Sequence, residues 1–149
     1  MPALDGMRIL DMTQYEAGPS CTQALAWLGA DVVKVERPEG GDPGRNNLSG
    51  DPNQSEYFSY WNSNKRSITI NLKSPEGHEI LMNMIPKYDV FIENYAPGVA
   101  DKLKLDYETL KAVHPGIIYA SVKGFGDSGP YSHYKCYDMV SQAASGAIS

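Results

Sequence analysis

Short apolar runs alternate with amphipathic segments along the whole chain. The runs are rich in valine and isoleucine, which favours buried strands. Strands are predicted at residues 8–12, 31–36, 67–72, 89–93 and 117–122. Strand–helix–strand units pair in parallel through right-handed crossovers. The pattern therefore predicts an α/β protein with an open, doubly wound parallel sheet and a ligand site at the carboxyl ends of its strands.

The first helix is predicted to begin near Pro19, because proline is tolerated at the first helical position. Its apolar face is predicted from four residues at helical spacing, Cys21, Ala24, Leu25 and Leu28. Gly29 is the expected stop, since glycine adopts the left-handed conformation that ends many helices. This helix would connect the first two strands.

Later helices have clear start signals. Ser74 and Pro75 are expected as N-cap and first helical residue of one helix, and Pro86 ends it. Its predicted apolar face consists of Ile80, Leu81, Met84 and Ile85. Asp106 is the expected N-cap of a second of two short helices, and a last helix is expected from about Asp138.

Residues 38–66 have a different composition, rich in Pro, Gly, Asn, Asp and Ser, with an aromatic patch YFSYW at 57–61. A connection of this length in a compact domain is usually functional or disordered. Because the aromatic side chains favour packing, we predict a long covering loop with one helical turn.

Composition narrows the functional classes. At 149 residues one domain is expected, and the net charge of -5 does not favour nucleic-acid binding. No apolar stretch has the length of a membrane span, and no signal peptide is expected at the start. Cys21 and Cys136 lack metal-ligand spacing, so we expect no metal site, two packing thiols and a cytoplasmic location.

The first strand-to-helix loop argues against a nicotinamide cofactor. Glu36 ends the second strand, where a dinucleotide-binding fold places its ribose-binding acid. The loop reads YEAGPSC, however, and lacks the pattern G-x-G-x-x-G. Without these glycines no nicotinamide cofactor is predicted.

Six stretches in order resemble one known family. They are LDGMRILDMT, AGPSCTQALAWLGADVVKVERPEGGDP, NSNKRSITINLKSPEG, DVFIENYAPG, YASVKGFG and YKCYDMVSQAASG. At this spacing they resemble the family III CoA-transferases, the CaiB/BaiF group, over essentially all of residues 1–149. The resemblance implies the N-terminal, Rossmann-like part of the family's large domain. It also implies a homodimer of interlocked chains, with the small domain and the C-terminal return absent from residues 1–149.

The resemblance implies coenzyme A, as free thiol or acyl thioester, as the substrate. Its phosphates need cations and backbone N–H groups, and its adenine needs a flat apolar surface. By similarity, the cationic contacts are Arg37, Lys73, Lys102 and Lys135. The segments expected to line the rest of the ligand contain Glu16, Ala17, Ile70, Asn71, Leu72, Asn94, Tyr95, Ala96, Cys136, Tyr137 and Asp138.

Glu16 is the residue of most mechanistic interest. Oxalate-type members of the family carry glutamine at this position, close to the thioester carbonyl. A carboxylate cannot donate a hydrogen bond to a developing oxyanion unless it is protonated. The departure argues against oxalate as the acceptor acid, and a solvated loop acid is the alternative interpretation of Glu16.

The family reaction, as the resemblance implies it, moves CoA from an acyl-CoA donor to a small carboxylic acid through aspartyl intermediates. The nucleophilic aspartate of the family follows Ser149, so residues 1–149 alone are expected to be inactive. The chain could also be a non-catalytic CoA-binding fragment, or one subunit of a split enzyme whose second chain supplies the missing part. A 2-methylacyl-CoA racemase is a further alternative, but such enzymes carry histidine where this chain has Tyr137.

Overall fold

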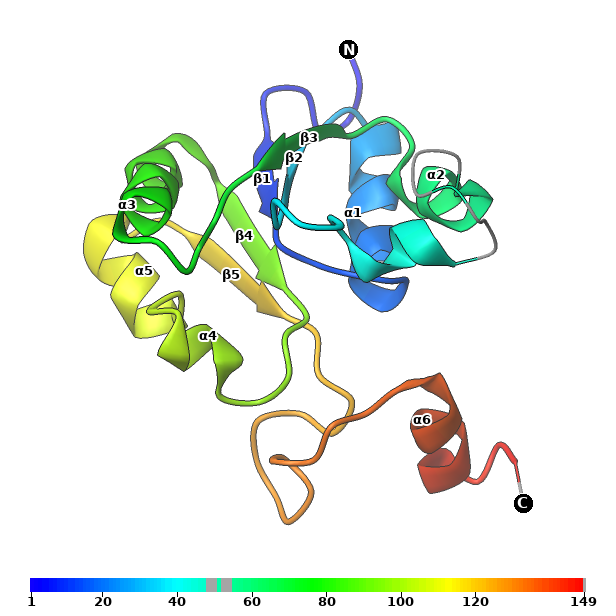
Figure 1. Ribbon diagram of the computed structural model, residues 1–149. Helices are drawn as coiled ribbons and strands as arrows, with labels where there is room; N and C mark the ends of the chain where they lie inside the picture. Colours follow the sequence, from blue (N-terminus) through cyan, green and yellow to red (C-terminus); the bar gives the residue numbers. More distant parts are fainter. Residues whose placement is uncertain (48–50, 52–54, 149) are drawn as a thin grey trace.

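Five parallel strands form one sheet in the computed structural model, which describes residues 1–47, 51 and 55–148. The spatial order is β3-β2-β1-β4-β5, so the order reverses between β1 and β4 (Figure 1). The strands are β1 (Arg8–Asp11), β2 (Asp31–Glu36), β3 (Arg66–Thr69), β4 (Val90–Glu93) and β5 (Ile118–Ser121). The predicted α/β class with a doubly wound parallel sheet is confirmed.

Helices cover both faces of this sheet (Figure 1). One face carries α1 (Ala17–Trp27) and the other carries α3 (Pro75–Met84) and α5 (Tyr107–Val113). The remaining helices are α2 (Glu56–Asn62), α4 (Val99–Lys102), α6 (Asp138–Ser145) and the 3-10 turns η1 (Pro43–Asn46) and η2 (Ile85–Lys87). None of the helices in this part of the chain has the length and apolar character needed to cross a membrane.

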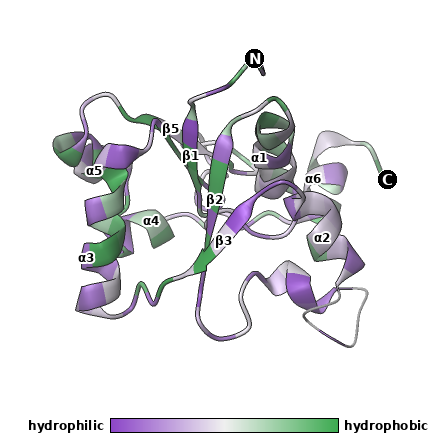
Figure 2. Cartoon of the chain, turned by 90° about the horizontal axis from the view of Figure 1, so that it is seen from above, coloured by the Kyte–Doolittle hydropathy of each residue, from purple (hydrophilic) through white to green (hydrophobic). Residues whose placement is uncertain are grey.

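Alternate residues of the central strands supply two cores. Ile9 and Ile92 pack on the α1 side, whereas Leu10 and Phe91 pack on the side of α3 and α5. This division follows from the period of two of a strand, in a sheet that is covered on both faces. Figure 2 shows hydrophobic and hydrophilic residues alternating along α3, as expected for a helix with one face on a sheet.

The predicted helix boundaries are confirmed at three caps. Ser74 Oγ accepts a hydrogen bond from the Gly77 amide at 3.0 Å, and Pro75 occupies the first turn of α3. Asp106 caps α5 by accepting from the Thr109 amide at 3.0 Å. Gly29 has φ of +105°, the left-handed conformation that ends α1. These helix ends could be predicted from the sequence because each cap depends on residues only a few positions apart.

The predicted apolar face of α1 is wrong. Cys21, Ala24 and Leu28 are exposed, and Leu25 is only half-buried. The buried face carries Gly18, Pro19, Thr22, Gln23 and Ala26 instead. Polar anchoring explains the difference, because Thr22 Oγ1 donates to the Asp11 carboxylate at 2.6 Å and the Gln23 amide donates to Ser63 Oγ at 2.8 Å. Cys21 is therefore not a packing residue.

Two smaller expectations also change. Ile80, predicted on the apolar face of α3, is 55% exposed, while Leu81 and Ile85 are fully buried. The region 38–66 contains the helix α2, capped by Ser55, in addition to the turn η1. Residues 48–50 and 52–54 of the predicted covering loop lie outside the described residues.

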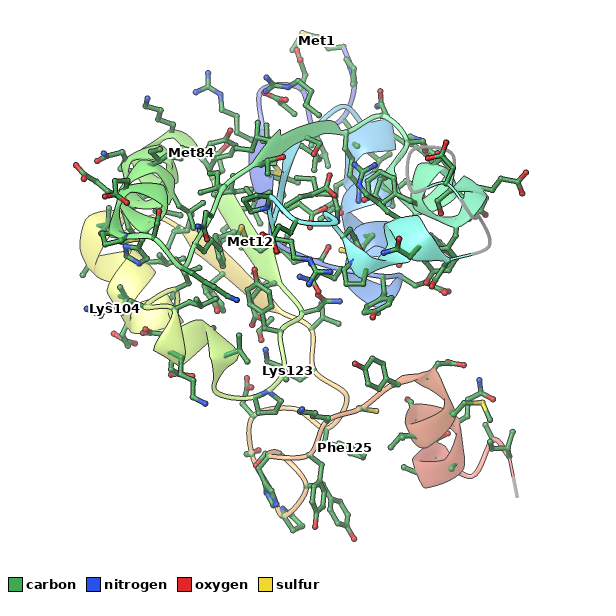
Figure 3. The ribbon with its side chains drawn as sticks, in the orientation of Figure 1. Met1, Met12, Met84, Lys104, Lys123 and Phe125 are labelled. Atoms are coloured by element: carbon green, nitrogen blue, oxygen red, sulfur yellow. The ribbon has the colours of Figure 1, made fainter. Side chains whose placement is uncertain are left out.

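The segment after β5 extends away from the sheet as a loop followed by α6 (Figure 1). The described helix α6 has no buried residue. Figure 3 places Lys123 between the carboxyl ends of the strands and the loop that carries Phe125. The segment 123–148 thus faces the carboxyl edge of the sheet and encloses space against it.

Candidate functional site

The loops that follow β1 and β4 meet where the strand order reverses. The Gln14 amide donates to Asn94 Oδ1 at 2.8 Å, and Asn94 Nδ2 donates to the Gln14 carbonyl at 2.7 Å. Such a reversal point leaves a crevice outside the carboxyl ends of the strands, where open α/β sheets bind their ligands. Both polar atoms of the Asn94 side chain are used in holding the two loops together.

Side chains from other elements also fix the backbone of the first loop. Lys34 Nζ donates to the Thr13 carbonyl at 2.6 Å, and the Tyr15 amide donates to Asp42 Oδ1 at 3.0 Å. Tyr15 adopts φ of +64°, which is uncommon for a residue with a side chain. The loop is therefore held in one conformation by groups that the ligand does not have to supply.

Two buried ion pairs lie beneath this loop. Lys34 Nζ is 2.8 Å from Asp42 Oδ2, and Lys65 Nζ is 3.1 Å from Asp11 Oδ2. Burial raises the pKa of Asp11, but Lys34 and Lys65 outweigh it and lower that pKa below its ordinary value. Burial lowers the pKa of Lys65 to about 8, against the attraction of Asp11. The pairs join β1, β2 and the segment around α2 in one polar layer under the site.

Glu36, which ends β2, is fully engaged by protein groups. Its carboxylate accepts from Arg45 at 2.7 Å through two guanidinium nitrogens, from Ser67 Oγ at 2.5 Å and from the Asp42 amide at 2.8 Å. Burial raises the pKa of Glu36, but these hydrogen bonds outweigh it and lower the pKa to about 2. The acid that a dinucleotide fold would offer to a ribose hydroxyl thus serves as an ion-pair partner in this chain.

The carboxyl end of β4 has a similar arrangement. Lys123 Nζ donates to both carboxylate oxygens of Glu93 at 2.8 Å and to the Tyr95 carbonyl at 2.7 Å. These three bonds use all three ammonium protons of Lys123. Burial, and then the Glu93 carboxylate, raise the pKa of the Tyr95 phenol. Tyr95 is therefore neutral at physiological pH and is held in place through its own backbone.

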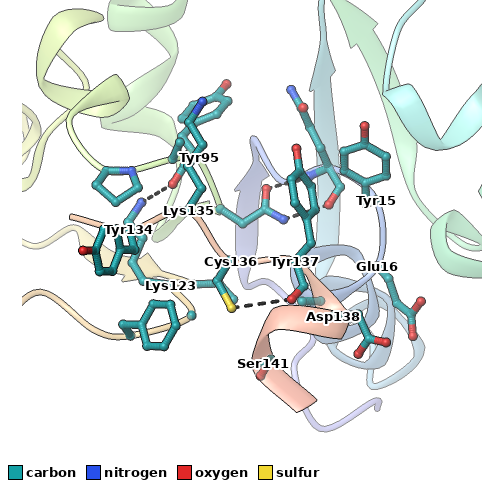
Figure 4. Close-up of a pocket in the computed structure, with 18 of the residues that line it drawn as sticks. Tyr15, Glu16, Tyr95, Lys123, Tyr134, Lys135, Cys136, Tyr137, Asp138 and Ser141 are labelled. Atoms are coloured by element: carbon teal, nitrogen blue, oxygen red, sulfur yellow. Dashed lines mark hydrogen bonds between the residues drawn. The ribbon is translucent and has the colours of Figure 1, made fainter. Parts of the chain in front are cut away.

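A cleft of about 800 Å³ lies between these strand ends and the segment 123–148 (Figure 4). A cleft of this size is in the range of small-molecule and cofactor sites. Nine of the residues expected to contact the ligand line it together: Glu16, Ala17, Asn94, Tyr95, Ala96, Lys135, Cys136, Tyr137 and Asp138. Sequence positions far apart thus converge on one hollow at the reversal of strand order.

The other six expected contacts lie outside this cleft: Arg37, Ile70, Asn71, Leu72, Lys73 and Lys102. Ile70 is buried in the core beside α3 and α5, and Leu72 packs against that core. Arg37 is exposed and its Nε donates to the Gly41 carbonyl at 2.9 Å. Asn71 accepts from the Lys73 amide at 3.1 Å, and Lys102 is exposed on α4. The predicted cations are thus not gathered in one place: Lys135 lines the cleft, whereas the other three lie in the segments that follow β2, β3 and β4 along the chain.

The cleft residues that were not predicted from the sequence include Tyr15, Tyr57 and Lys123. Tyr57 comes from the aromatic patch, which was interpreted as packing. Its hydroxyl lies 3.4 Å from Glu16 Oε2, and burial followed by the nearby Glu16 raises the pKa of Tyr57 to about 12. Lys123 belongs to a stretch that carries the family resemblance, but no local sequence pattern identifies Glu93 as its partner.

Close contacts position the segment 123–148, which forms one wall of the cleft. The Tyr15 and Tyr137 rings meet edge to face with centroids 6.3 Å apart. A side chain on Gly124 would collide with Cys136, so this close approach requires glycine.

Among the described residues, no group of three or more His, Cys, Asp or Glu side chains is arranged to hold a metal ion.

The fold and cleft define the chain as a Rossmann-like α/β protein with a cleft at its strand reversal. The family model described as CoA-transferase family III matches residues 4–149. The chain therefore belongs to CoA-transferase family III. Two curated relatives, formyl-CoA:oxalate CoA-transferases from Bradyrhizobium sp. (strain ORS 278) and Streptomyces coelicolor, are each 51% identical over 148 residues.

The match to these relatives covers 99% of this chain but only 35% and 36% of theirs, so the chain spans about a third of their length. The solved structure of the protein Rv3272 from Mycobacterium tuberculosis is similar with a TM-score of 0.90 and 36% identity, covering 99% of this chain and 40% of that one. A CaiB/BaiF family protein from Brucella suis has a TM-score of 0.87 and 41% identity, covering 97% and 39%.

A more distant likeness concerns the fold alone. A short-chain dehydrogenase/reductase family protein is 14% identical with a TM-score of 0.51, covering 99% of this chain and 66% of that one. This likeness shows a shared fold and nothing about the site. In this chain the first strand-to-helix loop has no G-x-G-x-x-G pattern, and Glu36 is paired with Arg45.

Proposed function

We propose that this chain forms the coenzyme A-binding part of an enzyme that transfers CoA from an acyl-CoA donor to a carboxylic acid. The observation that carries the proposal is the cleft at the strand reversal, where nine residues expected from the family resemblance converge. Membership of CoA-transferase family III supports it independently. The cleft volume of about 800 Å³ lies in the range of sites that bind small molecules and cofactors.

The residues of the cleft fit the chemistry of this substrate. Lys135 is exposed on the cleft wall and offers an ammonium group to a phosphate. Tyr95, Tyr134 and Tyr137 offer apolar ring surface. Arg37, Lys73 and Lys102 are proposed to reach the nucleotide end of CoA where it extends beyond the cleft. No metal or nicotinamide is part of the proposal.

The proposed reaction passes through aspartyl intermediates. An aspartate attacks the acyl-CoA thioester, which gives a mixed anhydride and CoA thiolate, and the thiolate then attacks the aspartyl carbonyl. The donor acid leaves, and the acceptor carboxylate attacks the aspartyl-CoA thioester to begin the same steps in reverse. By the family resemblance we expect this aspartate after position 149, and no acid of residues 1–149 is proposed as the nucleophile. The whole enzyme is proposed to work as an interlocked homodimer.

Tyr137 weighs against racemase activity. Exchange of an α-proton needs an acid or base whose pKa is near neutrality, and a phenol ordinarily has a pKa near 10. The Tyr137 ring instead packs edge to face on Tyr15. Its proposed role is to line the thioester portion of the cleft.

Calorimetric titration of the polypeptide 1–149 tests the proposal. Free CoA should bind, and pantetheine should bind more weakly because it lacks the phosphates. Lys135→Met should weaken CoA binding and leave pantetheine binding unchanged, whereas Lys104→Met, which changes an exposed lysine outside the cleft, should alter neither. If CoA does not bind, or if pantetheine binds as tightly as CoA, the assignment of the cleft is wrong.

A further inference from the structure

The cleft has opposite charges at its two sides. Figure 4 shows Lys123 and Lys135 on one side and Glu16 and Asp138 on the other. Lys123 is neutralised by Glu93, so Lys135 provides the positive charge of the first side. A ligand that lies across the cleft therefore meets a cation at one end and two carboxylates at the other.

A contact between two aromatic rings brings the acidic groups to the same side. Tyr15 and Tyr137 pack edge to face, and each directly precedes one of the acids, Glu16 and Asp138. Glu16 lies in the loop before α1, and Asp138 is the first residue of α6. The acidic side of the cleft is thus built from two distant segments and is not a local run of charge.

Tyr57 and Gln142 are the neutral side chains that lie beside these carboxylates. The Tyr57 hydroxyl lies 3.4 Å from Glu16 Oε2, and Gln142 Nε2 donates to Asp138 Oδ2 at 2.6 Å. The phenol of Tyr57 has a raised pKa, caused by burial and then by Glu16, so it keeps its proton and acts as a donor. A neutral donor leaves the negative charge of Glu16 uncompensated.

We infer that the Glu16 side of the cleft selects acyl groups whose far end is neutral and disfavours acyl groups that carry a second carboxylate. The inference rests on the proposed function, since it takes a CoA thioester as the ligand. A like charge placed a few ångströms from Glu16 is repelled strongly enough to weaken binding by about fivefold or more. The acceptor of this chain would therefore be a monocarboxylic acid, unlike the oxalate for which its relatives are named.

Two thioesters of equal chain length test this inference. Butyryl-CoA ends in a methyl group and succinyl-CoA ends in a carboxylate. Calorimetric titration of the polypeptide 1–149 at low salt should give at least about fivefold tighter binding of butyryl-CoA, and added salt should reduce the ratio. Glu16→Gln should clearly lower the ratio, with Asp138 remaining as a carboxylate on that side. Glu79→Gln, which removes an exposed carboxylate on α3, should leave the ratio as in the unmodified chain.

Free CoA, titrated in parallel, distinguishes a failure of the inference about Glu16 from a failure of the proposed CoA-binding function. If free CoA binds but the ratio is the same in Glu16→Gln as in the unmodified chain, the difference comes from the apolarity of the methyl group and the inference is overturned alone. Equal binding of both thioesters to the unmodified chain overturns it as well. If free CoA does not bind, the proposed function fails and the inference fails with it.

Discussion

Half-buried Lys123 and buried Glu93 form an ion pair whose ammonium nitrogen is 2.8 Å from both carboxylate oxygens. The same ammonium group holds the Tyr95 carbonyl at 2.7 Å, so it has no proton left for a ligand. Lys135, by contrast, is exposed on the wall of the same cleft. The two lysines therefore differ in role: Lys123 stabilises the strand end, whereas Lys135 faces the solvent in the cleft.

This division predicts opposite results for two matched variants. Lys123→Met leaves the Glu93 carboxylate buried without its partner, which should lower the free energy of unfolding by about 3 kcal/mol or more. Lys135→Met should change that free energy by less than about 0.5 kcal/mol, because it alters an exposed side chain. Urea denaturation followed by circular dichroism measures both. Equal stability of the two variants would contradict the assignment.

The hydrogen-bonded pair of Gln14 and Asn94 yields a second prediction. Asn94→Ala removes the donor and the acceptor that join the loops after β1 and β4. We expect a loss of about 1–2 kcal/mol in unfolding free energy, since the backbone groups of Gln14 lose their partners. CoA binding should weaken by about tenfold, because the cleft floor loses its fixed shape.

Asn83→Ala is the matched control, because Asn83 is exposed on α3 and away from the cleft. It should leave CoA affinity unchanged in calorimetry. An Asn94→Ala variant that is destabilised but binds CoA normally would show that the bonded pair serves folding only.

Glu36 predicts a pH dependence of stability. Its pKa is about 2 in the folded chain and 4.5 ordinarily, so the folded state binds the proton less tightly than the unfolded state. The stabilisation is complete above pH 4.5 and is lost as the pH falls from 4.5 towards 2. Urea unfolding at pH 6 and pH 3 should show this loss. Arg45→Met removes the guanidinium that binds Glu36 and should make the loss clearly smaller.

Arg66→Met is the comparison for that variant. Arg66 pairs with Asp31 at 2.7 Å, but both side chains are largely exposed, so removing the pair should cost less than about 0.5 kcal/mol at pH 6. If Arg66→Met alters the acid sensitivity as much as Arg45→Met, the Glu36 interpretation is wrong.

The cations outside the cleft give a fourth prediction. If Arg37, Lys73 and Lys102 reach the nucleotide end of CoA, neutralising each should weaken CoA binding but not pantetheine binding. Dephospho-CoA distinguishes the residues further, because only a cation that contacts the 3′-phosphate loses its effect with that ligand. Lys111→Met, on the exposed side of α5, is the control. Unchanged CoA affinity in all three variants would confine the phosphate contacts to the cleft.

The sequence predicted the sheet and most helix ends because those features depend on local patterns. Alternating apolar residues identify strands, and Ser74, Asp106 and Gly29 act within one turn of the helices that they begin or end. The family resemblance predicted that Glu16 and Tyr137 lie in the same site. No local pattern could predict this, because the two residues are far apart in the sequence.

Buried polar groups account for what the sequence did not reveal. The face of α1 was misassigned because Thr22 and Gln23 point inward, where Asp11 and Ser63 accept their hydrogen bonds. Lys34 stands in a valine-rich strand, and its partner Asp42 lies in the following loop. Pairing of this kind depends on the folded arrangement, because burying a charge is favourable only when its partner is already in place.

The first loop of the cleft has consequences for how a ligand enters. Thr13, Gln14 and Tyr15 are each bonded to a different neighbour, whereas the described helix α6 has no buried residue. We expect slow amide exchange in this loop and fast exchange along 123–148, since local opening follows the number of buried contacts. Motion of the segment 123–148 would then set the rate at which a ligand associates, while the loop after β1 remains rigid. A ligand would bind a preformed surface on one side and order the chain on the other.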